Sequence, residues 1–449
     1  MNHYFLLLDF GASYTKSSLL NITKGNLIAP LVFPAMKNIA RLDGHYEISP
    51  ADLTKQFLDI CEHYTVMNAS IEGVVICSQM HGFILLDQKN KPLTNYISWQ
   101  DERSLKKIDG ISSYEIITQQ LGESFKQITG MYPRAGLPIM NVMHLCRSND
   151  WSDKTIKLVT LPEWLALSHE TSNHCVHETM IAGTGFFDIN QKQISTVLVD
   201  MIKQHTRYQL TFNALAKEKD SAGHLVRPGK EITIYTGVGD HQCAILGAEN
   251  TSDSISINIG TGSQVAQING DLTLTDFERR PYFNNNYLLT RTHIPAGRAL
   301  NLYFGFLKSV MKDVWSEVNK LTPDDILQSS LSIDLAFFQS AFNHTSGGMI
   351  KKISEDNFTL QNYLASVLKC FLLQYVPLIN ELRAMNPKAK CILSGGIPRK
   401  LPHLTKALAC MINAEVRVAT KTEETLAGLH TIATSILQTN ASKSLFTIN

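Results

Sequence analysis

Two short apolar segments open the chain, separated by a turn that contains glycine. Residues 4–8 (YFLLL) and 15–20 (TKSSLL) flank that turn, and the pattern predicts a β-hairpin at the start of a sheet. Residues 73–77 (GVVIC) predict a buried strand, followed by the polar loop SQMHG and a further strand, FILLD. Residues 51–66 have apolar positions at helical spacing. Because strands and helices alternate, we expect an α/β fold.

A strand, a glycine turn and a second strand recur later in the chain. Residues 254–259 (SISINI) alternate in polarity, meet the turn GTGSQ and lead into the apolar segment VAQI. Hairpins with glycine are common, so the pattern alone leaves a duplication open. The 449 residues exceed one ordinary core. We expect two domains of like topology, residues 1–246 and 247–449.

Three later segments complete the predicted elements. Residues 360–384 predict a long amphipathic helix in which Pro377 is expected to cause a kink. Residues 391–400 (CILSGGIPRK) predict a buried strand, a Gly-Gly turn and the start of a helix. Residues 421–437 predict a closing helix.

Composition and charge narrow the classes of partner. Hydrophobic residues make up 44% and charged residues 18%, as in globular proteins. Lys and Arg number 41 against 40 Asp and Glu, so no global field attracts nucleic acid or an anionic membrane. The apolar segment before Asp9 is far shorter than the ~20 residues that span a bilayer, and no later segment is long and uncharged enough. We expect a soluble, cytoplasmic protein without nucleic-acid or membrane partners, and its oligomeric state stays open.

The cysteines carry little chemical signal. There are eight, none of them in a CxxC pair, and most lie in apolar segments. We expect buried free thiols in a reducing compartment and no structural zinc site.

A carboxylate, a glycine and a lysine occur together at the first predicted hairpin. Asp9 ends the apolar segment, Gly11 lets the backbone approach a ligand, and Lys16 with the turn amides could hold phosphate. Asp9 could also hold Mg²⁺ through water. Asp and Gly are equally common in ordinary hairpin turns, so this motif is ambiguous by itself.

Two polar segments suit a sugar. Residues 79–82 (QMHG) lie between two predicted strands, where polar groups often line a cleft, and His81 could bind a hydroxyl. Downstream, Trp99 could stack on a sugar face while Asp101 and Arg103 bond to hydroxyls. The alternatives are an ordinary loop histidine and a surface turn with a salt bridge.

Asp240 follows a strand and a glycine pair in the segment GVGDHQ. Glycine permits close approach of a substrate, and a carboxylate beside a hydroxyl can act as a general base. His241 is a rival base, and capping of the following helix is the structural alternative.

Two further glycine turns suit a nucleotide. Residues 260–263 (GTGS) offer backbone amides and two hydroxyls to a phosphate, although no GK[ST] follows as in a Walker A loop. At residues 394–396 (SGG), small residues between a strand and a helix would let a flat ring lie on the backbone.

The order of these motifs resembles one family from end to end. DFGASYTK, QMHG, WQDER, GVGDHQCAILG, NIGTGSQ and LSGGIPRK follow the order of the FGGY family of carbohydrate kinases. The resemblance implies two ribonuclease-H-like domains of the actin/hexokinase type around a central cleft, the first binding sugar and the second ATP, with Mg²⁺. Within the family, WQDER, GDHQCAILG, Gln264 and residues 281–284 (PYFN) resemble the sedoheptulokinase branch.

The resemblance also implies roles by position. Asp240 falls on the catalytic base and Asp9 on the metal-associated carboxylate. Glu178 stands where many relatives carry an Asp that faces the substrate, so its role stays open. The implied substrate-binding residues are Gln79, Met80, His81, Trp99, Asp101, Arg103, Glu178, Asp240 and His241. The implied ATP-binding and phosphate-binding residues are Gly11, Ser13, Thr15, Lys16, Gly260, Thr261, Gly262, Ser263, Gly395 and Gly396.

Some features depart from the family pattern. Ala12 replaces a usual Thr and removes one hydroxyl from the first phosphate loop. Residues 340–352 lack the GER-like stretch of larger relatives, and the C-terminal domain looks trimmed. These departures bear on ATP binding more than on the base.

The sequence therefore predicts phosphorylation of a ketose by ATP at a primary hydroxyl, with sedoheptulose, which would give sedoheptulose 7-phosphate, as the expected substrate. A xylulokinase-like kinase is the nearest alternative. A non-catalytic sugar or nucleotide sensor on the same fold is the rival from another class.

Overall fold

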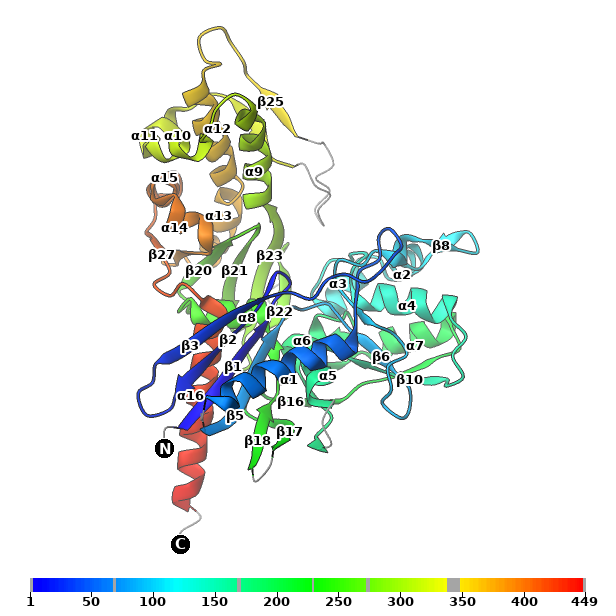
Figure 1. Cartoon of the computed structure of the whole chain (residues 1–449). Helices are drawn as coiled ribbons and strands as arrows, with labels where there is room; N and C mark the ends of the chain where they lie inside the picture. Colours follow the sequence, from blue (N-terminus) through cyan, green and yellow to red (C-terminus); the bar gives the residue numbers. More distant parts are fainter. Residues whose placement is uncertain are drawn as a thin grey trace. The chain divides into compact units, whose positions relative to one another are not determined.

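The protein consists of two compact units of contacting residues (Figure 1). The structure is a computed structural model that describes residues 3–67, 70–167, 171–227, 230–271, 275–336 and 348–446. Unit 1 comprises residues 1–247, 279–283 and 423–449, and unit 2 comprises residues 248–278 and 284–422. Part of the departure noted above, residues 340–347, lies outside the described residues. The assignment of a sugar site to one predicted domain and a nucleotide site to the other stays a prediction.

Unit 1 is built on a mixed β-sheet. In spatial order its strands are β11 (Thr171–Ser172), β17 (Ser221–Arg227), β18 (Lys230–Tyr235), β5 (Ser70–Ser78), β1 (His3–Phe10), β2 (Tyr14–Asn21) and β3 (Leu27–Pro34), with β19 (Val238–Gly239) also paired to β5. β1 and β2 form the predicted antiparallel hairpin, and β5 runs parallel to β1. β1 is buried along nearly its whole length, which explains its continuous apolar sequence.

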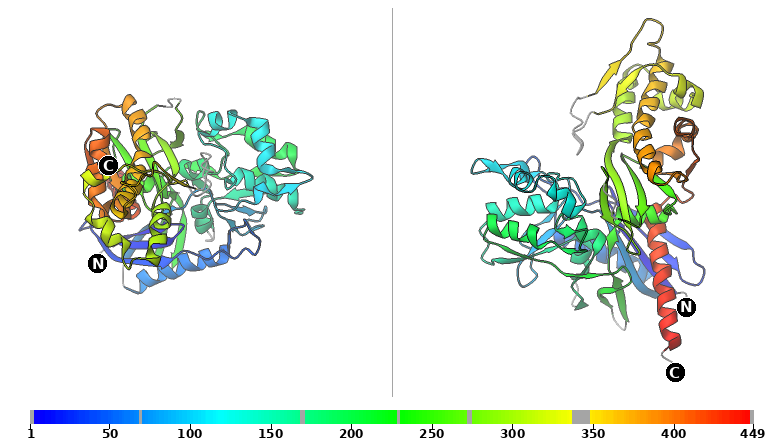
Figure 2. Two further views of the ribbon diagram at one scale, coloured as in Figure 1. Left: turned by 90° about the horizontal axis from the view of Figure 1, so that it is seen from above. Right: turned by 180° about the vertical axis from the view of Figure 1, so that it is seen from behind.

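Helices and short strands complete unit 1. The helices of unit 1 are α1 (Pro50–Val66), α2 (Ser113–Leu121), α3 (Ser124–Thr129), α4 (Pro138–Ser148), α5 (Leu161–Leu167), α6 (Glu178–Ala182), α7 (Thr196–His205), α8 (Asp240–Gly247) and α16 (Glu424–Phe446), with a 3-10 turn at Arg103–Leu105. Among them, α5, α8 and α16 contact the sheet. The short strands are β4 (Glu47–Ile48), β6 (Ile84–Leu86), β7 (Tyr96–Ile97), β8 (Lys107–Ile108), β9 (Ile111–Ser112), β10 (Thr155–Val159), β12 (Cys175–His177), β13 (Phe187–Asp188), β14 (Gln193–Ile194), β15 (Gln209–Thr211) and β16 (Ala214–Ala216). The predicted closing helix is α16, which begins at residue 424 and contacts α8, β1 and β5; Figure 2 shows it in red beside the blue strands.

Unit 2 repeats the strand order of unit 1. Its strands lie in the order β23 (Tyr287–Pro295), β21 (Gly262–Asn269), β20 (Ser254–Ile259), β26 (Lys390–Ser394) and β27 (Val416–Val418). In both units an antiparallel three-strand meander continues into parallel strands beside its first member. The prediction of an α/β fold with two units of like topology is therefore confirmed.

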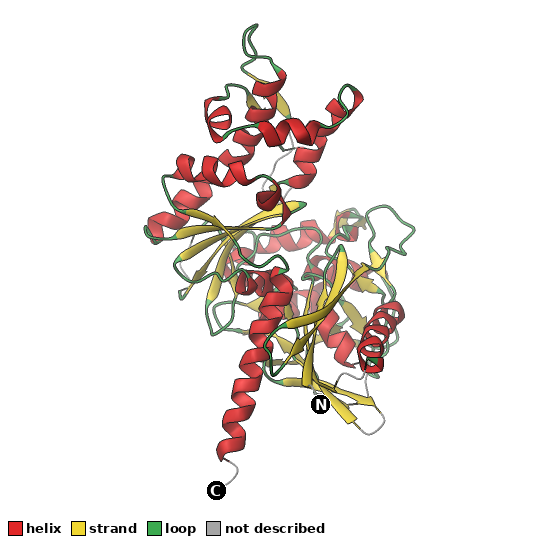
Figure 3. Ribbon diagram, turned by 60° about the vertical axis from the view of Figure 1, so that its left-hand side comes forward, coloured by secondary structure: helices red, strands yellow, loops and turns green. Residues whose placement is uncertain are grey.

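The helices of unit 2 enclose its hydrophobic core, and Figure 3 shows them in red next to the yellow strands. They are α9 (Gly297–Gly305), α10 (Val314–Lys320), α11 (Pro323–Gln328), α12 (Leu360–Leu373), α13 (Val376–Met385), α14 (Gly396–Lys400) and α15 (Pro402–Ile412), with a 3-10 turn at Phe306–Ser309. The remaining strands of unit 2 are β24 (Ser332–Asp334) and β25 (Met349–Lys351), whereas β22 (Glu278–Pro281) lies in unit 1 apart from Glu278.

The predicted helix at residues 360–384 forms two helices. α12 ends at Leu373 and α13 starts at Val376, so Pro377 occupies the first turn of a new helix, where its missing N–H costs nothing. By length and composition, residues 360–385 are the one described stretch apolar enough to cross a membrane, which corrects the expectation that no segment would be. More than half of its most apolar window is buried, and α12 supplies much of the unit 2 core.

The thiol prediction is confirmed in most respects. All eight cysteines are free. Six are buried, whereas Cys370 is half-buried and Cys410 is exposed.

Candidate functional site

The end of β1 places the first candidate carboxylate. Asp9 is only 4% exposed and lies opposite Lys16 of β2 and Cys77 of β5. A hydrogen bond of 3.1 Å from Gly11 N to Tyr14 O closes the turn that follows. A Cβ on Gly11 would lie 2.9 Å from that same oxygen, so the turn beside Asp9 requires glycine.

Other residues predicted at this loop point in different directions. Ser13 is exposed, whereas Thr15 is buried and its hydroxyl donates to Gln56 Oε1 at 3.1 Å. The ammonium of Lys16 lies 2.6 Å from Glu423 Oε2. Thr15 and Lys16 are thus engaged with protein groups, and their contacts with phosphate stay predictions.

The second candidate carboxylate begins α8. Asp240 is half-buried, and its Oδ1 accepts a hydrogen bond of 2.7 Å from His241 N. The backbone N–H of Gly239 donates to Thr179 Oγ1 at 3.0 Å, which fixes the strand end before Asp240. Asp240 therefore begins a helix, as its structural alternative expected. The charge of Asp9 also acts on its carboxylate.

Burial and nearby charges alter the protonation of both carboxylates. Burial first, and the charge of Asp9 second, raise the pKa of Asp240 to about 7, while Arg280 opposes the rise. Burial likewise raises the pKa of Asp9, against the hydrogen bond from Thr425 and the charge of Lys16. A carboxylate that exchanges its proton near neutral pH is well matched to general-base chemistry.

The loop after β5 lies against the start of α8. Gln79 N donates to Phe10 O at 2.9 Å, which ties the loop to the end of β1. A Cβ on Gly239 would lie 2.8 Å from Met80 Sδ, so Met80 packs on the residue before the candidate base. His81 has a left-handed backbone (φ 61°), and its Nδ1 donates to Gly183 O at 2.6 Å. Of the predicted sugar residues, Met80 is therefore placed beside the candidate base.

Glu178 and Thr179 open α6 on another side of Asp240. Glu178 is 8% exposed, and its Oε1 lies 3.0 Å from the half-exposed Lys217 ammonium. Thr179 is fully buried and holds Gly239. Sequence reasoning did not identify Thr179 as a site residue, because only its position next to Glu178 distinguishes it. His241 is 7% exposed.

A segment from the second half of the sequence joins this site. Residues 279–283 belong to unit 1, where Arg279 N donates to Gly130 O at 2.8 Å. Gln242 Nε2 of α8 donates to Pro281 O at 3.2 Å. Arg280, whose charge lowers the pKa of Asp240, is a second residue that sequence reasoning missed.

The WQDER segment forms a buried ion-pair network. Asp101 is fully buried and accepts hydrogen bonds from Arg103 Nε at 2.8 Å and from Tyr46 N at 2.7 Å. The same guanidinium donates to Glu47 Oε1 at 2.5 Å. Trp99 is 37% exposed. The polar atoms of Asp101 are therefore engaged within the protein, and its predicted sugar contact stays a prediction.

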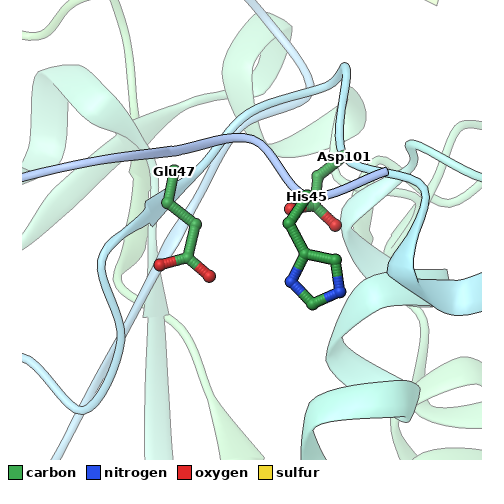
Figure 4. Close-up of side chains that lie close together, drawn as sticks. All are labelled: His45, Glu47 and Asp101. Atoms are coloured by element: carbon green, nitrogen blue, oxygen red, sulfur yellow. The ribbon is translucent and has the colours of Figure 1, made fainter. Parts of the chain in front are cut away.

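The ion-pair network overlaps a cluster of three side chains of the types that bind metal ions. One potential ligand atom from each of His45, Glu47 and Asp101 lies within 4.8 Å of the others, and Figure 4 shows the three side chains grouped. Arg103 already pairs with both carboxylates, and Lys106 Nζ lies 2.9 Å from His45 Nε2. Burial and the charge of Arg103 lower the pKa of His45. Because Arg103 and Lys106 already place two positive charges on these ligand atoms, this cluster is a poor site for a divalent metal ion.

Asp101→Asn is expected to destabilise the fold. Loss of the Asp101 charge leaves the buried Arg103 guanidinium with Glu47 as its remaining acidic partner among the described contacts, and the loss of one such buried partner typically costs about 1–3 kcal/mol. Urea unfolding would measure the change, with Glu102→Gln, an exposed neighbour, as the matched control. An Asp101→Asn variant as stable as the control would show that the network contributes nothing.

The glycine turn of unit 2 rests on the start of α9. Gly260 N donates to Gly262 O at 3.0 Å, and Gly297 N donates to Gly260 O at 3.1 Å. Arg298 N donates to Thr261 O at 3.0 Å. The turn predicted from GTGS is thus fixed by backbone bonds.

The second glycine turn of unit 2 lies next to the first. A Cβ on Gly395 would lie 2.4 Å from Ile259 O, and Gly395 has a φ of 88°, so this position requires glycine. Ser263 faces the interior instead, because its hydroxyl donates to Ile294 O and accepts from Tyr375.

A cavity of about 570 Å³ opens beside both turns. This volume is within the range of small-molecule sites. It is lined by Gly260, Thr261, Gly297, Arg298, Asn301, Trp315, Asn319, Gly396, Ile397, Lys400 and Leu401. The structure thus brings Gly260, Thr261 and Gly396 together, as the sequence predicted.

Known proteins resemble this chain in sequence. Residues 4–247 match the family model described as the FGGY family of carbohydrate kinases, N-terminal domain. Xylulose kinase from Lactococcus lactis is 24% identical over 341 residues, covering 71% of this chain and 65% of that enzyme. Xylulose kinase from Staphylococcus xylosus is 25% identical over 304 residues, covering 63% of this chain and 58% of that enzyme. The chain thus matches less than two thirds of the length of these curated relatives.

Solved structures resemble it along nearly its whole length. Ligand-bound xylulose kinase from Lactobacillus acidophilus has a TM-score of 0.83 at 17% identity, covering 97% of this chain and 90% of that one. Glycerol kinase from Plasmodium falciparum with ADP has a TM-score of 0.79 at 17% identity, covering 99% and 92%. At such low sequence identity these similarities show the fold alone. They confirm the predicted actin/hexokinase-type fold.

Proposed function

The chain belongs to the FGGY family of carbohydrate kinases, and from this premise we propose that it transfers the γ-phosphoryl group of ATP to a primary hydroxyl of a ketose. The observation that carries the proposal is the pair of carboxylates Asp9 and Asp240, in which burial first and the charge of Asp9 second raise the pKa of Asp240 to about 7. Asp240 is the proposed base, and it takes the hydroxyl proton as the sugar oxygen attacks phosphorus.

Charge neutralisation and positioning make up the rest of the proposed mechanism. Asp9 fits a Mg²⁺ site, because it offers hard carboxylate oxygens beside a tight glycine turn, and Mg²⁺ in kinases needs only one or two carboxylates besides water and phosphate. When bound, Mg²⁺ would offset the negative charge of the phosphates. The unit 2 cavity with its two glycine turns is the proposed ATP site.

Xylulose is the first candidate substrate. The matching curated relatives in Lactococcus lactis and Staphylococcus xylosus are xylulose kinases. Sedoheptulose, expected from WQDER and residues 281–284, has no support from these relatives. It stays the second candidate because residues 279–283 join unit 1 and contact α8.

A substrate screen tests the proposal. ADP release would be followed in the presence of Mg²⁺ and ATP with xylulose, ribulose, sedoheptulose, fructose, gluconate or glycerol. We expect turnover with a ketose, fastest with xylulose, and little ADP without sugar. Sugar binding without ADP release would point to a sensor, and a preference for glycerol or gluconate would refute the ketose assignment.

A further inference from the structure

Thr425 contacts Asp9 from the far end of the sequence. Its hydroxyl donates to Asp9 Oδ2 at 2.6 Å, across 416 positions of the chain. The other oxygen of the carboxylate accepts a much longer bond, 3.6 Å, from Cys77 Sγ. A hydroxyl–carboxylate bond as short as the first is charge-assisted and about twice as strong as a neutral one. Thr425 is therefore the stronger of these two partners.

Backbone packing, and not this hydroxyl, sets the position of Thr425. A Cβ on Gly247 of α8 would lie 1.8 Å from Glu424 O, and a Cβ on Gly428 would lie 2.0 Å from Cys243 O. The backbones of α8 and α16 therefore touch on both sides of Thr425. Cys243 Sγ also donates to Thr425 O at 3.2 Å. Removal of the hydroxyl alone should leave the helix in place.

The start of α16 and the residue before it thus contact Asp9 and Lys16, the two charged side chains beside the turn of the β1–β2 hairpin. Thr425 bonds Asp9, and Glu423, just before the helix, pairs with Lys16 at 2.6 Å. We propose that Thr425 is a positioning residue for phosphoryl transfer, whose hydroxyl holds the Asp9 carboxylate in one orientation and so supports the binding of Mg²⁺. This inference rests on the proposed role of Asp9.

The test compares three variants of the full chain. Thr425→Val removes the hydroxyl at nearly constant shape, and Thr425→Ser retains it. Thr431→Val is the matched control, because that hydroxyl, on the same helix, bonds only to the helix carbonyl of Ala427 among the described contacts. The probe is Mn²⁺, titrated calorimetrically at saturating ADP, together with the Mg²⁺ dependence of kcat.

We expect Thr425→Val to weaken Mn²⁺ binding by about 10- to 100-fold, as for other groups that orient a metal ligand. Thr425→Ser and Thr431→Val should bind Mn²⁺ as the wild type does, and the KM for sugar should not change. Wild-type Mn²⁺ affinity in Thr425→Val, or equal weakening in Thr425→Ser, would overturn the inference. So would a fall in the urea midpoint of Thr425→Val with an equal loss of sugar binding. If the wild type phosphorylates no sugar but the Mn²⁺ affinities differ as expected, the proposed function fails, whereas the role of Thr425 in orienting Asp9 for a metal ion stands.

Discussion

Asp240→Asn is expected to lower kcat for the ketose by about 10²- to 10⁴-fold, the usual contribution of a general base. Asparagine keeps the size of the side chain and an acceptor oxygen but cannot take the hydroxyl proton. The KM for the sugar should therefore change little. Steady-state ADP release at pH 8 measures both constants. Asp59→Asn, which alters an exposed carboxylate of α1 paired with Lys55, is the control and should retain wild-type kcat.

The pH profile gives an independent check on the same residue. Because the pKa of Asp240 is raised to about 7, its basic form decreases as pH falls through 7, and kcat/KM of the wild type should decrease with it. The sign for stability is opposite. A raised carboxyl pKa means that the folded state binds the proton more tightly, so this group costs stability as pH rises from about 4 to 7. Asp240→Asn should therefore be no less stable than the wild type at pH 8.

Two outcomes would contradict the assignment of the base. One is a kcat for Asp240→Asn within tenfold of the wild-type value. The other is a large loss of kcat in His241→Ala that Asp240→Asn does not show, which would transfer the role to His241. A flat kcat/KM between pH 6 and 8 would disagree with the raised pKa.

Local patterns predicted the parts of the site that depend on neighbours in sequence. The apolar segment before Asp9 and the glycine after it dictate a strand and a tight turn, and both are present. The same holds for Gly395 in the turn at residues 394–396, where a positive φ and the nearby Ile259 O exclude a side chain. The α/β fold followed because these segments alternate with amphipathic helices.

Contacts made by distant segments could not be predicted. Thr425 lies in an ordinary helical sequence, and nothing local distinguishes its hydroxyl from that of Thr431. Arg280 lies in a short segment that returns to unit 1, and periodicity carries no information about such a return. Asp101 and Arg103 have residue types that suit a sugar equally well, and only the fold shows that they bond each other.

Gly247→Ala is expected to have the largest effect on stability. The new Cβ would lie 1.8 Å from Glu424 O and 2.5 Å from Gly428 N. Both are backbone atoms that no change of rotamer can move, so α8 and α16 would have to separate. Overpacking usually costs 1–3 kcal/mol, and because neither helix backbone can yield alone we expect about 3 kcal/mol or more.

The separation should also reach the proposed chemistry. If α16 moves from α8, Thr425 moves from Asp9, so the Gly247→Ala variant should need more Mg²⁺ for half-maximal kcat, as Thr425→Val does. Gly305→Ala is the matched control, because a Cβ on this helical glycine of unit 2 meets no atom within 4 Å and removes backbone freedom from the unfolded chain. Urea unfolding should therefore give a Gly305→Ala variant at least as stable as the wild type. If the Gly247→Ala variant matched the Gly305→Ala variant in stability and Mg²⁺ dependence, α8 and α16 would be able to accommodate the added Cβ. Their contact would then not be what positions Thr425.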